Sequence, residues 1–281
     1  MILEELKKVV RDEREKGRSA AFIRNALKEY LQVYILSFVY TSAEYNKAMI
    51  FTGGTCLRHF YGLERLSEDV DFDFLSELDT ERLAENLERY FVAGYKFSDV
   101  AVSLKQQGRQ VLIKFPVLDK LELAFAKGSR VLYVKMDLSP VPSMNYKAIV
   151  SSQSRYGFNY VARHYDLPDL FAGKIHAILR RKLLKGRDHR PSVKGRDYFD
   201  LLWFLRQKIK PNFKRLSDML GEQLSVSDVV QLLRERVYDL NRMQEDFKAD
   251  VLPLVQNPNA IGFYVDNYRE EFFRYIDNVE W

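Results

Sequence analysis

Asp69 and Asp71 are two carboxylates in a segment where acidic and apolar residues alternate as far as Phe74. Alternation of this kind predicts a β-strand, and side chains two residues apart on a strand project from the same face. Paired carboxylate oxygens suit Mg²⁺ shared with a nucleoside triphosphate. Asp137, in a later apolar segment, is our candidate for a third carboxylate on a neighbouring strand, which would complete a two-metal site. An isolated Asp-x-Asp pair, however, more often marks a solvated strand face.

Gly53 and Gly54 end a short apolar run, residues 48–52, that precedes these carboxylates. The pattern predicts a buried strand, a tight turn and then a short helix. Two glycines let the backbone approach a phosphate closely, and the N–H groups of a helix N-terminus point at such an anion. Thr55 and Ser67 are candidates to add hydroxyl donors to the same phosphates.

A second group of charged residues lies in the C-terminal half. Lys174 sits in the middle of a predicted helix between apolar neighbours, so its ammonium must either reach solvent or find an anion such as a triphosphate. In the second case its loss should change stability little. Asp197 and Asp200 lie three apart on one helix. Either Asp197 caps that helix and Asp200 forms a structural salt bridge, or the two carboxylates orient Lys174 and the attacking group. Arg196 either pairs with Asp200 or binds phosphate.

The order strand, Gly-Gly, helix, Asp-x-Asp and later acidic strand resembles the signature of polymerase-β-type nucleotidyltransferases. Two further motifs narrow the resemblance: an Ala-Gly-Lys segment ending at Lys174, and a Lys-Gly-Arg-Asp-x-x-Asp segment from Lys194 to Asp200. With them, the chain resembles the AbiEii/AbiGii family of nucleotidyltransferase toxins over about Met49 to Trp203. The N-terminal helices and roughly the last 75 residues carry no motif that matches.

The resemblance implies the toxin of a bacterial toxin–antitoxin pair, cytosolic and neutralised by a neighbouring antitoxin. Some members transfer nucleotides from a nucleoside triphosphate to the 3′ end of tRNA. It implies Mg²⁺ (or Mn²⁺) on Asp69, Asp71 and Asp137, with Lys174 neutralising the pyrophosphate. Two alternatives stay open, an NTP-dependent kinase and a non-catalytic RNA-binding or partner-binding module. The kinase would release a nucleoside diphosphate, and the module would not need the carboxylates.

Charge is distributed unevenly along the chain. Between Lys174 and Arg215 there are fourteen Lys or Arg against three Asp, whereas between Glu64 and Glu85 there are nine acidic residues against two basic ones. These are either two solvated faces or a carboxylate site and a basic surface for a polyanion such as RNA, with Lys182, Lys185 and Arg187 among its members.

Composition and length exclude several classes of protein. With 281 residues, 47% of them apolar and 14% aromatic, the chain is neither disordered nor collagen-like. One cysteine, Cys56, excludes a disulfide framework and a multi-cysteine zinc site, and favours a reduced, cytoplasmic setting. The longest uncharged run, residues 30–43, is too short to cross a membrane, and the first residues lack the pattern of a signal peptide.

The order of the predicted elements is helices, a mixed α/β block and more helices. We therefore expect an α+β fold, with N-terminal helices and a small mixed nucleotidyltransferase sheet in residues 1–160 and a helical domain in residues 161–281. Ser19 and Asp166 are predicted to cap helices. The later strands are predicted at residues 96–104, 110–117 and 132–138, with an edge piece at 121–125, and Pro140 and Pro142 should end the sheet.

Overall fold

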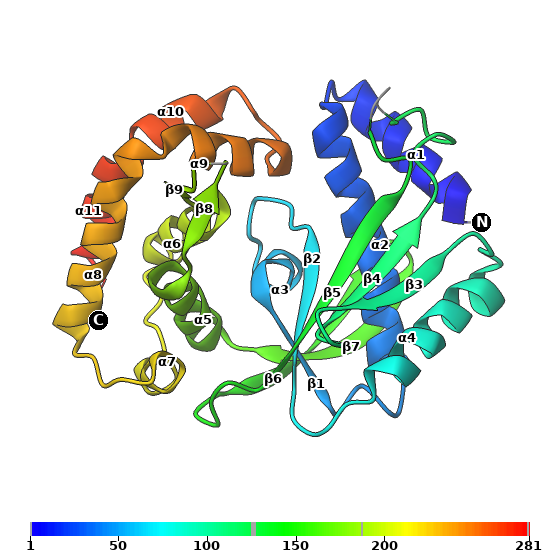
Figure 1. Ribbon diagram of the computed structural model, residues 1–281, viewed down its shortest axis with the longest axis horizontal. Helices are drawn as coiled ribbons and strands as arrows, with labels where there is room; N and C mark the ends of the chain where they lie inside the picture. The colour runs from blue at the N-terminus through cyan, green and yellow to red at the C-terminus, as the bar shows by residue number, and fades with distance from the viewer. Residues whose placement is uncertain (1, 125–127, 187, 280) are drawn as a thin grey trace. The chain divides into compact units, whose positions relative to one another are not determined.

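The computed structural model describes residues 2–124, 128–186, 188–279 and 281 (Figure 1). The chain forms two compact units. Unit 1 comprises residues 1–141 and 148–164, and unit 2 comprises residues 142–147 and 165–281. Each unit is described by itself.

Unit 1 is built on a mixed sheet that has seven strands within the described residues, in the order β3-β4-β5-β2-β1-β7-β6. Strands β2 and β5 are parallel, as are β1 and β7, whereas β1–β2, β3–β4 and β4–β5 are antiparallel. The strands are β1 (Met49–Thr52), β2 (Asp69–Phe74), β3 (Ala101–Lys105), β4 (Gln110–Phe115), β5 (Leu132–Pro140), β6 (Ala148–Arg155) and β7 (Phe158–Tyr165).

The alternation in the sequence sets the two faces of this sheet. On β5, Val134 and Met136 are fully buried, whereas Lys135 and Asp137, which alternate with them, are more exposed. Strand β2 alternates in the same way from Asp69 to Phe72, with Val70 buried, whereas Asp73 near its end is also buried. One face of the central strands thus packs into the apolar core, and the opposite face carries the acidic side chains.

Helices pack around the sheet of unit 1. The predicted N-cap of helix α2 (Ala20–Thr41) is confirmed, because the Ser19 side chain accepts a hydrogen bond from the Phe22 N–H. That helix is buried on nearly all sides, which is typical of a helix enclosed within a domain. The helices are α1 (Ile2–Glu15), α2 (Ala20–Thr41), α3 (Gly53–Phe60), α4 (Thr80–Arg89) and the π-helical turn η1 (Tyr90–Gly94).

Two predictions about the sheet are wrong. Pro140 and Pro142 do not end it, because the hairpin β6–β7 returns afterwards and β7 pairs with β1 through Phe51 and His164. This hairpin has a weak pattern in sequence, since β6 is a sheet edge rich in serine and glutamine. The edge piece expected at 121–125 is turn and coil over residues 121–124, and Phe125 lies outside the described residues.

Unit 2 is helical, as expected, with one small hairpin. The predicted cap is confirmed, because the Asp166 side chain accepts from the Asp169 N–H and Pro168 occupies the first turn. Its helix ends at Arg180 because the hairpin follows directly. The elements are α5 (Leu167–Arg180), β8 (Leu183–Lys185), β9 (Arg190–Ser192), α6 (Gly195–Arg206), α7 (Phe213–Leu220), α8 (Val226–Asp239), η2 (Leu240–Arg242), α9 (Gln244–Val251), η3 (Leu252–Leu254), α10 (Ala260–Asp266) and α11 (Tyr268–Ile276).

Within the described part of the chain, no helix is long and apolar enough to cross a membrane.

Candidate active site

The glycine turn between β1 and α3 is in direct contact with a carboxylate. Gly53 has a φ of +75°, and a Cβ atom built there would lie 1.9 Å from Oδ2 of Asp71. At Gly54 a Cβ atom would lie 2.8 Å from Nη2 of Arg65 and 3.0 Å from Oγ of Ser67. A side chain at either position would have to displace these groups, so the backbone at the start of α3 is packed against the side chains that follow it. The N–H groups of this first helical turn have no partner within the helix, as anion binding requires.

The sheet register aligns four polar residues in one line across four strands. Asp71 on β2 lies opposite Thr52 on β1 and opposite Asp137 on β5, and Asp137 lies opposite Gln110 on β4. Partners in a register point to the same face of a sheet. We call Thr52, Asp71, Asp137 and Gln110 the polar row. The predicted neighbour relation between Asp137 and the Asp-x-Asp strand is thus present.

Within the polar row, the amide Nε2 of Gln110 donates to Oδ1 of Asp137 at 2.7 Å. This bond fixes the orientation of the carboxylate. Sequence analysis did not find Gln110, because its place beside Asp137 depends on the pairing of β4 with β5, for which the spacing of residues carries no signal.

Asp69 is the second carboxylate on the same face of β2. Its side chain is about one quarter exposed, and Oδ1 lies 3.9 Å from Nζ of Lys135, its register partner on β5. The lysine therefore offsets part of the negative charge that two neighbouring aspartates concentrate here.

Thr55 and Ser67 differ in what they can offer a phosphate. Thr55 is completely buried, and its hydroxyl donates to the backbone carbonyl of Asp69. The expected role of this hydroxyl at a phosphate is therefore corrected: the group is used to hold α3 against β2. Ser67 keeps its Oγ close to Gly54, where the prediction of a phosphate contact still stands.

Arg65 is a further residue of this site that sequence analysis missed. It is 1% exposed, and its Nη1 donates to the carbonyl of Leu66 at 2.8 Å. The same guanidinium reaches Gly54. An arginine in a short loop gives no sequence signal of its own, and only the folded loop brings this cation to the N-terminus of α3.

Two titratable groups on α3 are held neutral by burial. Burial raises the pKa of the Cys56 thiol well above its ordinary value, and the nearby Asp71 acts in the same direction. Burial, together with the nearby charges of Arg155 and Arg58, lowers the pKa of His59 to about 3. Neither ring nitrogen of His59 has a hydrogen-bond partner among the described residues. Cys56 therefore packs as a protonated thiol, which agrees with a role in the core.

In unit 2 the predicted charged residues form one cluster. Nζ of Lys174 lies 2.7 Å from Oδ2 of Asp200 and 3.6 Å from Oδ1 of Asp197. The Asp200 side chain is fully buried, and Asp197 also pairs with Arg181. The ion pair between Lys174 and these carboxylates, the structural alternative for the lysine, is thus present, and loss of Lys174 would leave a buried carboxylate uncompensated. Arg196 contacts Asp250: its backbone N–H donates to Oδ2 at 3.0 Å, and its Nε lies 3.9 Å from the same oxygen.

Much of the basic block is neutralised within unit 2. Asp246 on α9 accepts from Lys185 at 2.6 Å and from Arg190 at 2.7 Å, and these bonds hold the pKa of its carboxyl well below the usual range. Lys182, by contrast, is exposed and has no partner among the described residues. Arg187 lies outside the described residues.

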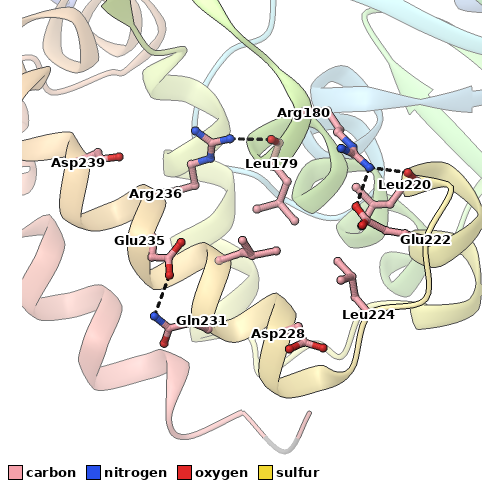
Figure 2. A pocket seen from close by; sticks show the side chains of 11 residues that line it. Leu179, Arg180, Leu220, Glu222, Leu224, Asp228, Gln231, Glu235, Arg236 and Asp239 are labelled. Carbon is pink, nitrogen blue, oxygen red and sulfur yellow. Dashed lines mark hydrogen bonds and ion pairs between the residues drawn. The ribbon is translucent and has the colours of Figure 1, made fainter.

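Unit 2 also contains a cavity of about 690 Å³ between α5, α7 and α8 (Figure 2). Its lining includes Leu179, Leu220 and Asp228. Arg180 is tied to the Leu220 carbonyl and to Glu222. The predicted site residues of this unit do not line it.

The donor set in unit 1 fits a divalent metal in its chemistry, because Asp69, Asp71 and Asp137 offer hard carboxylate oxygens from adjacent strands. Among the described residues, however, no three His, Cys, Asp or Glu side chains are gathered closely enough to form a ready-made metal site.

The fold of this chain is shared with a solved toxin. MenT4, a nucleotidyltransferase toxin from Mycobacterium tuberculosis H37Rv, superposes with a TM-score of 0.58 at 18% identity, covering 98% of this chain and 90% of that chain. JHP933 from Helicobacter pylori aligns with a TM-score of 0.45 at 16% identity, covering 89% of this chain and 94% of that chain, a similarity too low to support a conclusion. No curated protein matches the chain.

The sequence defines the class of this protein, a nucleotidyltransferase. The sequence model described as nucleotidyl transferase AbiEii toxin, type IV toxin–antitoxin system, matches residues 37–276. The chain belongs to this AbiEii family of nucleotidyltransferase toxins, which confirms the resemblance noted in the sequence. The match extends well beyond the motifs that carried that resemblance, to α11, but it begins only within α2.

Proposed function

We propose that this toxin transfers a nucleoside monophosphate from a nucleoside triphosphate to a hydroxyl of an RNA acceptor, with the 3′ end of tRNA as the preferred target. The observation that carries the proposal is the sheet register, which places Asp71 beside Asp137 and against the glycine turn. A nucleotidyltransferase must stabilise the charge of a triphosphate and orient the attacking hydroxyl, and neighbouring carboxylates beside a glycine turn can serve both needs.

In the proposed roles, the backbone at Gly53 and Gly54 and the hydroxyl of Ser67 hold phosphate oxygens. Asp69 and Asp71, joined by Asp137, would hold Mg²⁺ (or Mn²⁺). Such a metal, when bound, neutralises the charge of the triphosphate. The sequence resemblance assigns Lys174 to the charge of the pyrophosphate, and its contacts with Asp197 and Asp200 fix its position within unit 2.

The reaction balances without any further reactant. The acceptor oxygen attacks the α-phosphorus, the bond from that phosphorus to its bridging oxygen breaks, and pyrophosphate leaves. In this proposal Asp137 takes the proton from the acceptor hydroxyl, and its hydrogen bond from Gln110, which orients the carboxylate, supports that role. Membership of a type IV toxin–antitoxin family implies a cognate antitoxin, and we place the reaction in the cytoplasm.

The test is incubation with labelled nucleoside triphosphates, Mg²⁺ and total cellular RNA. We predict that Asp69→Asn and Asp71→Asn each abolish label transfer, because an amide cannot replace a charged oxygen ligand, while the melting temperature stays close to that of wild type. Asp12→Asn, at an exposed position on α1, is the matched control. Full transfer by either site variant would contradict the assignment of Asp69 and Asp71 as metal ligands. Release of nucleoside diphosphate in place of pyrophosphate would indicate a kinase, and absence of any labelled product would indicate a binding module.

A further inference from the structure

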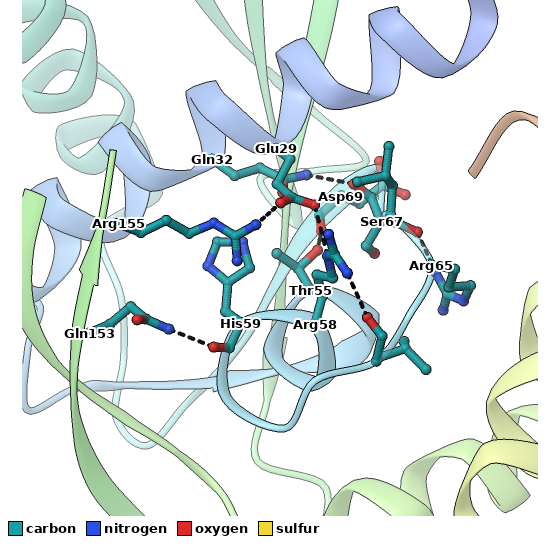
Figure 3. Close-up of polar contacts among 12 residues, drawn as sticks. Glu29, Gln32, Thr55, Arg58, His59, Arg65, Ser67, Asp69, Gln153 and Arg155 are labelled. Carbon is teal, nitrogen blue, oxygen red and sulfur yellow. Dashed lines mark hydrogen bonds and ion pairs between the residues drawn. The ribbon is translucent and has the colours of Figure 1, made fainter. Parts of the chain in front are cut away.

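Helix α2 makes a buried ion cluster with α3, the helix that begins at the glycine turn. Glu29 is 2% exposed, and its two carboxylate oxygens pair with Arg58 on α3, at 3.1 Å, and with Arg155 on β6 (Figure 3). Arg58 also donates to the carbonyl of Leu63 at 3.0 Å. A buried charge satisfied by two guanidinium groups holds its partners in a defined geometry. Glu29 therefore ties α3 to α2.

The same stretch of α2 also contacts the segment that enters β2. The amide Nε2 of Gln32 donates to the backbone carbonyl of Ser67 at 3.0 Å, and Gln32 is completely buried. One turn earlier, Nζ of Lys28 pairs with Oε1 of Glu68 at 2.9 Å. Lys28 and Gln32 are four residues apart and so share a face of the helix. Figure 3 shows Glu29 and Gln32 extending from α2 toward the elements that carry Thr55 and Asp69.

We propose that α2 is part of the catalytic apparatus, with Gln32 as a positioning residue that sets the Asp-x-Asp strand relative to the glycine turn. The family model begins at residue 37, so the three α2 residues lie before the matched stretch. The inference rests on the proposed function where kcat is measured. Hydrogen exchange of backbone amides gives a second readout that does not depend on activity.

The physical reason is the close packing between the glycine turn at the start of α3 and the segment that leads into β2. Ser67 Oγ lies 3.0 Å from the place of a Cβ atom at Gly54, and Asp69 follows two residues later. Pairing with β5 holds β2 along its whole length from Asp69 to Phe74, and the bond from Gln32 holds Ser67 in the segment that leads into the strand. A displacement of about 1 Å in a reacting group can cost about a hundredfold in rate. Loss of one anchoring bond in this segment is therefore expected to act on turnover.

The decisive variant is Gln32→Met, which keeps a long side chain and removes the donor. The matched control is Tyr40→Phe, because the Tyr40 hydroxyl, also on α2, donates to the backbone carbonyl of Arg163 at 2.7 Å. Both variants delete one bond from α2 to a carbonyl, so their melting temperatures should fall by similar amounts. We expect Gln32→Met alone to lower kcat by about tenfold, and to speed hydrogen exchange at residues 67–71 by about the same factor.

A second variant separates positioning from simple loss of packing. Gln32→Glu can donate to the Ser67 carbonyl only while its carboxyl is protonated, and its ionised form repels that oxygen. Its activity relative to wild type should therefore fall as pH rises, whereas the ratio for Tyr40→Phe should stay flat. Equal exchange at residues 67–71 and equal kcat in Gln32→Met and Tyr40→Phe would overturn the inference. Should wild type show no transfer at all, the proposed function fails, and the exchange comparison still decides the role of Gln32.

Discussion

At the scale of single residues, the charged cluster of unit 2 shows how burial changes the meaning of a lysine. Lys174 is 14% exposed and lies between two buried carboxylates, one of them fully buried. Its side chain is thus paired within unit 2 rather than extended into solvent. A role at the pyrophosphate and a role in folding are compatible, because a paired lysine is also one whose position is fixed.

We predict that Lys174→Met lowers the free energy of unfolding by about 3 kcal/mol, because removing one partner of a buried ion pair leaves an uncompensated charge. Thermal unfolding at neutral pH measures this. Lys120→Met is the control, since its pair with Asp99 is half exposed and should contribute little. Equal melting temperatures for the two variants would mean that the Lys174 ion pair contributes no more to stability than the exposed Lys120 pair. A loss of about 10- to 150-fold in kcat/KM in Lys174→Met would in addition support a phosphate contact.

The buried, neutral His59 should make the free energy of unfolding depend on pH. Its pKa in the folded chain is about 3, below the value of about 6.5 for an unfolded chain. The unfolded state therefore binds more protons between these values, and the stability is fully present above about pH 6.5 and is lost as pH falls. At pH 5 the loss should be about 2 kcal/mol. Urea unfolding of wild type and His59→Leu at pH 5 and 7.5 measures it, and an equal pH response of the two proteins would contradict the assignment.

At the scale of elements, the junction between β1 and α3 depends on one backbone conformation. Gly53 combines a left-handed φ with direct contact between its backbone and the Asp71 carboxylate. Gly62 has almost the same φ, +77°, but an added Cβ atom there would meet no other atom within 4 Å. The two glycines thus separate the cost of backbone strain from the cost of displacing the Asp71 side chain.

We predict that Gly53→Ala and Gly62→Ala each cost about 1–2 kcal/mol of stability through left-handed backbone strain. Only Gly53→Ala should also abolish nucleotide transfer, because its methyl group must displace Asp71. Melting temperatures and label transfer under the conditions of the Asp69→Asn assay measure the two effects. Retained activity in Gly53→Ala would mean that the contact with Asp71 is not needed for catalysis.

At the scale of the whole molecule, the net charge of +5 hides a division between acidic and basic stretches. In the folded chain several cations of the basic block are paired with carboxylates, as Lys185 and Arg190 are with Asp246. The charge available to a polyanion is therefore smaller than the sequence count suggests, and exposed residues such as Lys182 carry more of it.

If the basic block binds RNA, affinity should fall steeply with salt, with a slope of about −0.7 in log K against log salt for each contacted phosphate of a single strand. Lys182→Ala should reduce that slope by about one contact, whereas Lys120→Ala, outside the block, should leave it unchanged. Fluorescence anisotropy of a labelled RNA across a salt series measures both. Binding of RNA that does not respond to salt would argue for a small-molecule or protein acceptor.

The sequence by itself determined the local features of this protein. Strict alternation around Asp71 predicted a strand with its carboxylates on one face, and Ser19 and Asp166 were predicted as helix caps, because these features depend on neighbours within a few residues. The motifs around the two glycines and Lys174 were enough to indicate the family, which the match over residues 37–276 confirms.

Only the tertiary structure decided which distant residues share the site. Strand pairing brought Gln110 to Asp137, loop folding brought Arg65 to Gly54, and helix packing brought Gln32 to the carbonyl of Ser67. The same packing committed Thr55 to a backbone carbonyl and returned the chain to the sheet after Pro140. These contacts join residues that are adjacent in space and far apart or unpatterned in sequence, so neither hydrophobic periodicity nor motif spacing encodes them.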